Sequence, residues 1–517
     1  MKIENRGIFV PFFAGRRHCF ALCFTMALAS KSNIQVGSVV FPTTQKHEKG
    51  ANCEWFSTRR PTGGGEEGWK RETKGWVLPR ERGIIIRNPL TLWAKLEMTQ
   101  NDTQSNLDAE SQKVSTRRQD TINRLGQEEG LAPWAMHLAD AGQRAFPDAE
   151  RAADRNEFQR DQSRIIHSTS FRKLQYKTQV FTNTRGDLFR TRLTHSMEVA
   201  QISRSTARAL RLNEDLAETL GLAHDIGHAP FGHLGQDVLQ SLMKARGGDF
   251  EHNLHGIRIV DKLESPYIEH DGLNLLFATR EGILKHCSMK NARKIGDLGE
   301  RFVNKRSAGL EAQLVDWCDA LAYTHSDLED GIREGVLSVE QSKAGLPGFA
   351  AAMEQVKERY SVKDETDSRV YRQAINLMMK GAISDIIDAT AKSIEESGIR
   401  NVEDVRARSG YVAGFSPEYY KEHMAMKKFL SKNLYNHPDV SRTRDMHHGM
   451  LESIFLAYER APALMQKGKI DEKDLPRTIC DHIAGMTDRY VIEEFTHLQQ
   501  QKISDRPVAK RRAGMRG

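Results

Sequence analysis

Ten residues, HDIGHAPFGH at positions 224–233, contain three histidines and one aspartate, with two glycines and a proline among them. An imidazole binds divalent metal ions and exchanges protons near neutral pH, and borderline metals accept imidazole nitrogen and carboxylate oxygen together. His224 and Asp225 are adjacent, so their side chains can meet on one ion at the end of a helix, where water has access. The decamer therefore indicates a metal-binding pair, and its chemistry depends on residues outside these ten positions.

Such a pair needs further ligands from other parts of the chain. One candidate is His195, in the preceding segment RLTHSMEVA. A second carboxylate is available in QLVDWCDALAYTHSDLED, residues 313–330, where we consider Asp316, Asp319 and Asp327. A histidine, a His-Asp pair and a distant aspartate would leave coordination positions open for water and substrate, as a hydrolytic site requires.

The elements that carry these residues have a helical pattern, because apolar residues recur every three or four positions and alternation of period two is scarce. We expect one helix over 193–213 and a second that begins at the N-cap Asn213 and runs until Gly227. Pro230 and Gly232 force a turn before the helical pattern resumes. Further helices are expected over residues 309–336, 371–396, 415–434, 446–466 and 475–500. The predicted fold class is all-α.

Composition narrows the class of protein. The chain has 517 residues, 39% of them hydrophobic, and a formal net charge of +7 at pH 7, which is typical of a soluble globular protein rather than a membrane protein. The positive excess lies near the two ends, so the middle gives no reason to expect nucleic-acid affinity. The six cysteines are scattered without a CxxC pair, which indicates reduced thiols in a cytosolic protein.

The first 97 residues differ from the rest, since they are basic and lack helical or strand periodicity. CFALCFTMALAS, residues 19–30, resembles a short signal-peptide core but is too short to span a bilayer. Export is one interpretation, and the other, which we favour, is an extension upstream of a native start at Met98. The expected organisation is a basic extension over 1–97, a polar disordered lead-in over 98–130, one domain over 131–500 and a basic tail over 501–517.

The order H…HD…D and the longer strings around it resemble the dGTP triphosphohydrolase branch of the HD-domain metal-dependent phosphohydrolases. An HD pair alone has little specificity, but HD-x-GH-x-PFGH with flanking strings in the right order is specific. The resemblance implies an HD-domain helical core with additional C-terminal helices. It rests on FRKLQYKTQVF (171–181), RLTHSMEVAQ (192–201), AHDIGHAPFGHLGQD (223–237), FEHNLHGIRIV (250–260) and DHIAGMTDRY (481–490).

The resemblance also implies roles for individual side chains. One divalent ion is expected, Mg²⁺ or Mn²⁺, although nitrogen ligands would also accept iron. The implied ligands are His195, His224, Asp225 and Asp319. The implied catalytic histidines are His228 and His233, which face the phosphates with His233 near the scissile bond, and His252. The implied substrate-binding residues are Arg192 on the phosphates and Gln179, Tyr323 and Asp327 along the sugar.

The function that follows from the resemblance is hydrolysis of deoxynucleoside triphosphates in the cytoplasm. A metal-activated water would attack the α-phosphorus and give a deoxynucleoside and inorganic triphosphate. The planar fork of an arginine suits phosphate, and a tyrosine beside the sugar would crowd a 2′-hydroxyl. A homo-oligomer with an effector nucleotide is also expected, whereas the sequence does not indicate a nucleic-acid or membrane partner.

Two departures from the family pattern leave alternatives open. Gln236 stands where many relatives have glutamate, and a glutamine can orient a histidine but cannot take its proton. Ser326 fills a position where the family has histidine, and His325 is displaced by one residue, so we assign His325 no role. One alternative is an HD phosphodiesterase or 5′-nucleotidase. The other is a catalytically weak regulator that binds a nucleotide or nucleic acid. Gln236 and the basic tail are the features that favour this second alternative.

Overall fold

The computed structural model describes residues 128–148, 155–180, 190–362, 364–365, 367–465 and 471–504. Throughout this part of the chain the regular structure is helical, and the extended contact is a single antiparallel bridge between Thr178 and Thr191. The all-α prediction is therefore confirmed. The predicted extension over 1–97, almost all of the lead-in over 98–130 and most of the basic tail lie outside the described residues.

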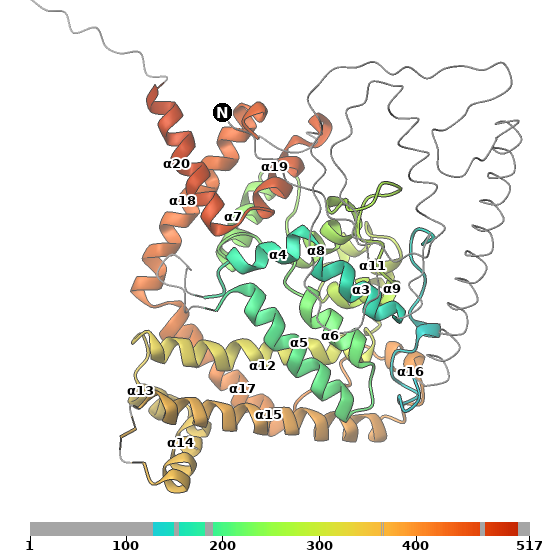
Figure 1. Ribbon diagram of the computed structural model, residues 1–517, viewed down its shortest axis with the longest axis vertical. Coiled ribbons are helices and arrows are strands. Elements are labelled where there is room, and N and C mark those ends of the chain that lie inside the picture. The colour runs from blue at the N-terminus through green and yellow to red at the C-terminus, as the bar shows by residue number, and fades with distance from the viewer. Residues whose placement is uncertain are drawn as a thin grey trace, which may run out of the picture. The chain divides into compact units, whose positions relative to one another are not determined.

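The described residues form three hydrophobic cores, and the first surrounds two central helices, α5 (Arg192–Ala209) and α6 (Glu214–Ala223). They pack against each other and against α12 (Leu310–Arg333), and α6 also packs against α3 (Glu157–Ile166), as Figure 1 shows. The contact between α5 and α6 is close, because a Cβ on Gly221 would lie 2.5 Å from the Cα of Ala200. This close packing fixes the end of α6 relative to the start of α5.

The second core joins α7 (His233–Lys244) to three C-terminal helices. These are α18 (Pro438–Arg460), α19 (Leu475–Ala484) and α20 (Asp488–Ser504), drawn in orange and red in Figure 1. Phe231, which precedes α7, is buried in this core together with side chains such as Leu451 and Ile483. The turn at the end of the HDIGHAPFGH segment therefore packs on the C-terminal helices.

The third core is built on the other side of α12 by α13 (Val339–Gly345), α14 (Pro347–Tyr360), α15 (Ser368–Glu396) and α17 (Pro417–Leu430). The long helices α12 and α15 pack against each other (Figure 1). A π-helical turn over Ser431–Tyr435 continues α17. The remaining short helices are α4 (Thr169–Lys173), α8 (His252–Arg258), α9 (Phe277–Ile283), α10 (Met289–Ala292), α11 (Asp297–Val303) and α16 (Val402–Arg406).

The expected helices 309–336 and 371–396 are confirmed as α12 and α15, and α17 with its π turn covers the expected 415–434. Asn213 is the predicted N-cap of α6, and its side chain accepts from the N–H of Leu216. However, α6 ends at Ala223 rather than Gly227, and His224 is its C-cap residue. The His-Asp pair therefore lies at a helix end, as its chemistry led us to expect.

Two expected C-terminal helices are wrong in their bounds. The helix expected over 446–466 begins earlier, at Pro438, where proline suits the first helical turn because the N–H it lacks would have no helical partner. The single helix expected over 475–500 is two helices, α19 and α20. The interruption has a local cause, because the Thr487 hydroxyl accepts from the N–H of Tyr490 and so starts a new helix.

Gly227 allows the turn after His224 to lie directly on the backbone of α8. A Cβ at this position would lie 2.0 Å from the carbonyl oxygen of His252 and 2.5 Å from the nitrogen of Gly256. Both neighbours are backbone atoms, so the contact cannot be relieved by a change of side-chain rotamer. Gly227 therefore sets the distance between the His-Asp turn and the helix that begins with His252.

None of the described helices is long and apolar enough to cross a membrane.

We predict that Gly227→Ala lowers the free energy of unfolding by about 1–3 kcal/mol or more, the cost of overpacking a tight contact. Gly449→Ala in α18 is the matched control, since a Cβ there meets nothing within 4 Å in the described part of the chain. It should raise the free energy of unfolding by up to about 1 kcal/mol through helix propensity. Urea unfolding of both variants measures this, and equal stability of Gly227→Ala and the parent would contradict the packing.

Candidate active site

A cavity of about 630 Å³ lies where the first and second cores meet α12. This volume is within the range of about 300–1,000 Å³ typical of ligand pockets. Every side chain assigned a role from the sequence lines it: Gln179, Arg192, His195, His224, Asp225, His228, His233, His252, Asp319, Tyr323 and Asp327. Sequence positions 179 to 327 therefore contribute to one site.

Three helix positions bring the proposed metal ligands together. The N-terminal turn of α5, with Thr191 as N-cap in a capping box, presents Arg192 and His195. The end of α6 presents His224 and Asp225. Asp319 belongs to α12, where Tyr323 and Asp327 follow at intervals of four and share its face. The start of α5, the end of α6 and one face of α12 therefore form the site.

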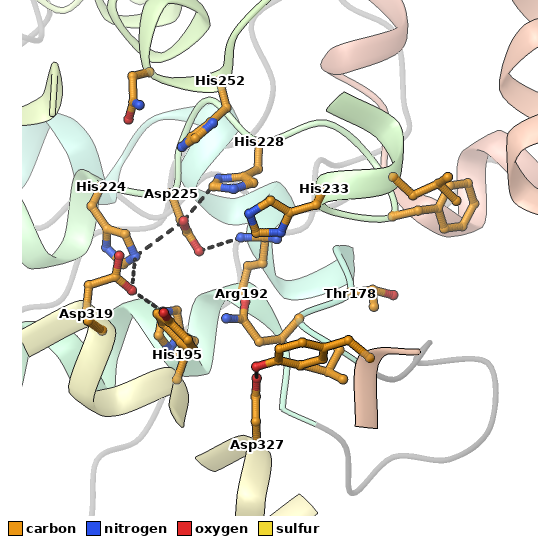
Figure 2. A pocket seen from close by; sticks show the side chains of 18 of the residues that line it. Thr178, Arg192, His195, His224, Asp225, His228, His233, His252, Asp319 and Asp327 are labelled. Carbon is orange, nitrogen blue, oxygen red and sulfur yellow. Dashed lines mark hydrogen bonds and ion pairs between the residues drawn. The ribbon is translucent and has the colours of Figure 1, made fainter. Parts of the chain in front are cut away.

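Nitrogens of His195 and His224 and an oxygen of Asp319 converge on one small volume, and the Asp225 carboxylate lies beside His224 (Figure 2). Asp319 Oδ1 lies 2.9 Å from His195 Nε2 and 3.5 Å from His224 Nε2. Asp225 Oδ1 lies 3.3 Å from the same His224 nitrogen. Ligand atoms from His195, His224 and Asp319 all lie within 4.8 Å of one another. These separations suit three ligands that share one ion. The fourth expected ligand, Asp225, lies outside this group, and its Oδ1 is 3.0 Å from His228 Nδ1.

The orientation of His224 tests whether a cation fits. Its Nδ1 donates to the carbonyl oxygen of Gly221 at 2.7 Å, so in the neutral ring Nε2 carries a lone pair. That nitrogen is buried and has no hydrogen-bond partner among the described residues, and the oxygens nearest to it belong to Asp225 and Asp319. A lone pair that faces two carboxylates is unfavourable, and against the effect of burial these carboxylates raise the pKa of His224, so that without an ion Nε2 binds a proton. A divalent cation at the same place would replace that proton. The donor set therefore fits a divalent ion.

Each carboxylate uses its second oxygen to bind a cationic side chain. Asp225 Oδ2 accepts from Arg192 Nη1 at 2.7 Å, and Asp319 Oδ2 accepts from Lys285 Nζ at 2.8 Å. Burial alone would raise the pKa of Asp225, but His224, His228 and Arg192 hold that pKa well below its usual range. The pKa of Asp319 is likewise lowered against the effect of burial, chiefly by Lys285. Both groups are therefore anionic at neutral pH.

Three further histidines form a cluster beside this centre (Figure 2). The ring of His228 lies 4.1 Å from that of His252 and 5.8 Å from that of His233, between centroids. Burial is the main cause that lowers the pKa of His228, to about 3, and it lowers the pKa values of His233 and His252 as well. In the absence of ligand these rings are therefore neutral near pH 7, and each offers one N–H group as a hydrogen-bond donor and one lone pair that can accept a proton.

Gln236 has a defined structural role despite its departure from the family pattern. Its Oε1 accepts from His252 Nδ1 at 2.5 Å and from the His252 N–H at 3.2 Å, which fixes the ring and leaves Nε2 as the acceptor. A carboxylate is also near, because Glu251 Oε1 lies 3.1 Å from the same Nδ1. The glutamine therefore orients His252.

His325, to which we assigned no role, lies outside the cavity lining. Its Nδ1 donates to the carbonyl oxygen of Leu321.

Several lining residues were not expected from the sequence. One is Lys285, which follows α9 in a segment without a motif. Besides its bond to Asp319, Lys285 Nζ lies 3.4 Å from Asp316 Oδ1, and Asp316 Oδ2 accepts from the Tyr411 hydroxyl. Asp316 thus lines the cavity wall but is not among the convergent ligand atoms, and of the carboxylates considered from the sequence it is Asp319 that joins them. Tyr435 donates to Asp327 Oδ2 at 2.5 Å, and burial raises the pKa of Asp327 to about 7.

Comparison with known proteins agrees with this geometry. The HD domain model matches residues 192–324, and the phosphohydrolase-associated domain model matches residues 413–497. A protein from Thiobacillus denitrificans is 44% identical over 72% of this chain and 98% of its own length, and one from Azoarcus sp. is 47% identical over 71% and 96%. Both bear the name deoxyguanosinetriphosphate triphosphohydrolase-like protein.

Among solved structures, a hypothetical protein from Aquifex aeolicus aligns with 66% of this chain and 72% of its own, at 18% identity and a TM-score of 0.31. The family assignment rests on the sequence relatives, which match this chain over nearly their whole length. The chain belongs to the deoxyguanosinetriphosphate triphosphohydrolase-like family of HD-domain phosphohydrolases.

Proposed function

We propose that this chain hydrolyses deoxynucleoside triphosphates, dGTP or dNTPs more generally, to deoxynucleoside and inorganic triphosphate. The observation that carries the proposal is the juxtaposition, in one cavity, of the convergent His-Asp centre with Arg192 and three neutral histidines. A triphosphate brings about four negative charges, which an ion and preplaced donors can stabilise as charge develops on phosphorus. The names of the relatives support this substrate class.

We assign His195, His224, Asp225 and Asp319 as the residues that would hold one divalent ion, Mg²⁺ or Mn²⁺, with iron also suited to the nitrogen ligands. When bound, such an ion lowers the pKa of water and neutralises charge on a phosphate oxygen. Lys285 and Arg192 hold the outer oxygens of Asp319 and Asp225, so the inner oxygens stay directed at the shared volume. The residues thus preorganise the centre.

Arg192 and the histidine cluster would act on the triphosphate. Arg192 Nε is buried and lacks a hydrogen-bond partner in the described part of the chain, and a phosphate oxygen would supply one. The negative charge of a bound triphosphate would raise the pKa of His233, and the imidazolium so formed would give its proton to the O5′ of the departing deoxynucleoside. His228 and His252 would bind phosphate oxygens through an N–H group or orient water.

The other end of the cavity would bind the sugar. Tyr323 and Asp327 share a face of α12, and the Tyr435 hydroxyl fixes the Asp327 carboxyl. Gln179 lines the cavity with them. Tyr323 would crowd a 2′-hydroxyl and so favour deoxynucleotides. We further propose that the enzyme acts in the cytoplasm, and that it forms a homo-oligomer that responds to an effector nucleotide.

We predict that metal-loaded protein converts dNTPs to deoxynucleoside and inorganic triphosphate in equal amounts, and that chelation of the metal stops the reaction. Ion chromatography after incubation with each of the four dNTPs, and with mixtures of them, measures this. Release of pyrophosphate or orthophosphate would instead support the phosphodiesterase or nucleotidase alternative. Nucleotide binding without any product would support a catalytically weak regulator.

Asp225→Ala should lose the bound divalent ion and hydrolysis together, while its helical content stays near that of the parent. Asp316→Asn is the control, because this carboxylate is on the same cavity wall as Asp319 but pairs with Lys285 and Tyr411. It should retain its metal. Elemental analysis and circular dichroism measure both variants, and full metal content in Asp225→Ala would remove this residue from the ligand set.

His233→Ala should keep its metal and measurable nucleotide affinity but lose about 10²–10⁴-fold in turnover, the range expected when a positioned acid or base is removed. His228→Ala should lose less, about 1.5–3 kcal/mol of transition-state stabilisation, if it only hydrogen-bonds a charged phosphate. Single-turnover rates, binding and metal content of the two variants and His224→Ala separate these roles. Loss of metal in His233→Ala, with metal retained in His224→Ala, would reverse the assignment.

A further inference from the structure

The turn before His233 has an unusual backbone conformation. Phe231 has φ of 58° and Gly232 has φ of 61°, so both residues lie in the left-handed region. Glycine adopts this region readily, but a bulky aromatic residue does so only when its surroundings hold it there. Because this turn sets the start of α7, it also sets the position of His233. The contacts that hold Phe231 are therefore relevant to catalysis.

The carboxylate of Asp488, at the start of α20, accepts from two backbone groups of the cavity wall. Its Oδ1 accepts from the N–H of Phe231 at 2.8 Å, and its Oδ2 accepts from the N–H of Thr178 at 2.7 Å. Asp488 is only 5% exposed, so these bonds form away from bulk water. One side chain of the C-terminal segment thus joins two segments that line the cavity.

Two other contacts connect the same turn to the C-terminal segment. The ring of His447 in α18 stacks on Phe231, with centroids 3.8 Å apart and planes 8° apart. Lys177 is buried, and its Nζ donates to the carbonyl oxygens of His228 and, at 3.0 Å, Ala484. Three C-terminal helices therefore contact the HDIGHAPFGH segment or the segment at Lys177 and Thr178. The contacts are made by the last residue of α19, the first residue of α20 and the middle of α18.

The Thr178 bond extends this connection to the phosphate-binding arginine. Thr178 forms the isolated bridge with Thr191, the N-cap of α5, and the N–H of Arg192 donates to Lys177 O at 3.2 Å. Arg192 also lies against the turn itself, since a Cβ on Gly232 would be 2.8 Å from Arg192 Nη2. Asp488 therefore contacts the segments that position both His233, the proposed acid, and Arg192, the proposed phosphate-binding residue.

We propose that Asp488 is a positioning residue for the hydrolytic reaction, through the two backbone N–H groups that it holds at Phe231 and Thr178. The phosphohydrolase-associated segment, 413–497, would then take part in turnover by fixing the geometry of the HD segment, in addition to burying a core with it. This inference rests on the proposed function for its kinetic consequences, but its structural part is independent of the substrate.

The test is Asp488→Asn in the full chain. Asparagine has nearly the same shape and keeps one acceptor oxygen, but its NH₂ group would face a backbone N–H where the second oxygen was. We expect kcat for dNTP hydrolysis to fall about 10–100-fold, because small displacements of catalytic groups are costly, with a smaller change in KM and unchanged metal content. Asp488→Glu, which keeps the charge on a longer arm, should show an intermediate loss.

Glu494→Gln is the matched control on the same helix. Glu494 is also a buried carboxylate, but its partner is the Tyr458 hydroxyl at 2.8 Å, away from the cavity lining. It should lose stability as Asp488→Asn does and keep the kcat of the parent. Hydrogen exchange adds a readout that does not depend on activity. The amides of Thr178 and Phe231 should exchange faster in Asp488→Asn and at the parental rate in Glu494→Gln.

The outcomes separate this inference from the proposed function. If the parent releases triphosphate and a soluble Asp488 variant has the parental kcat, Asp488 is not a positioning residue. An equal loss of kcat in Glu494→Gln would also overturn the inference, since the effect would then follow stability alone. If the parent releases no triphosphate, the proposed function fails, and the exchange of the two amides still decides whether Asp488 holds the turn.

Discussion

The placement of the Asp225 and Asp319 carboxylates around one buried nitrogen, His224 Nε2, is the constraint on which the rest of the site depends. Two carboxylates that face one atom are unfavourable in a medium of low dielectric unless a cation neutralises them. Lys285 and Arg192 compensate the outer oxygens of Asp319 and Asp225, and the lone pair of His224 remains directed at the inner ones. The negative charge of the inner oxygens remains uncompensated, and one divalent ion would neutralise it.

This constraint explains how the helices are arranged around the cavity. The ligands need three separate chain segments to meet, so they lie at the start of α5, at the end of α6 and on one face of α12. The close packing at Gly221 brings α6 near to α5, and the close packing at Gly227 brings the His-Asp turn near to α8, which carries His252. The C-terminal helices complete the cavity by holding the turn that carries His233.

The sequence was informative where chemistry and local pattern coincide. The residues given a role from the sequence all line one cavity, and Asn213 begins α6 as its side chain predicts. Lys285 and Tyr435 could not be predicted, because they reach the cavity from segments without a motif and their partners are distant in sequence. The division of the last helix was missed because apolar periodicity continues across it, although Thr487 is an adequate N-cap.

The most direct test of this account is the state of a bound Mn²⁺ ion, measured by titration and pulsed electron paramagnetic resonance. The account predicts one tightly bound Mn²⁺ per chain, with couplings to the nitrogens of two imidazoles. One of these couplings should disappear in His195→Ala and the other in His224→Ala. Absence of Mn²⁺ binding, or a bound ion that shows no imidazole coupling, would contradict the assignment of the convergent histidines and carboxylates as a metal centre.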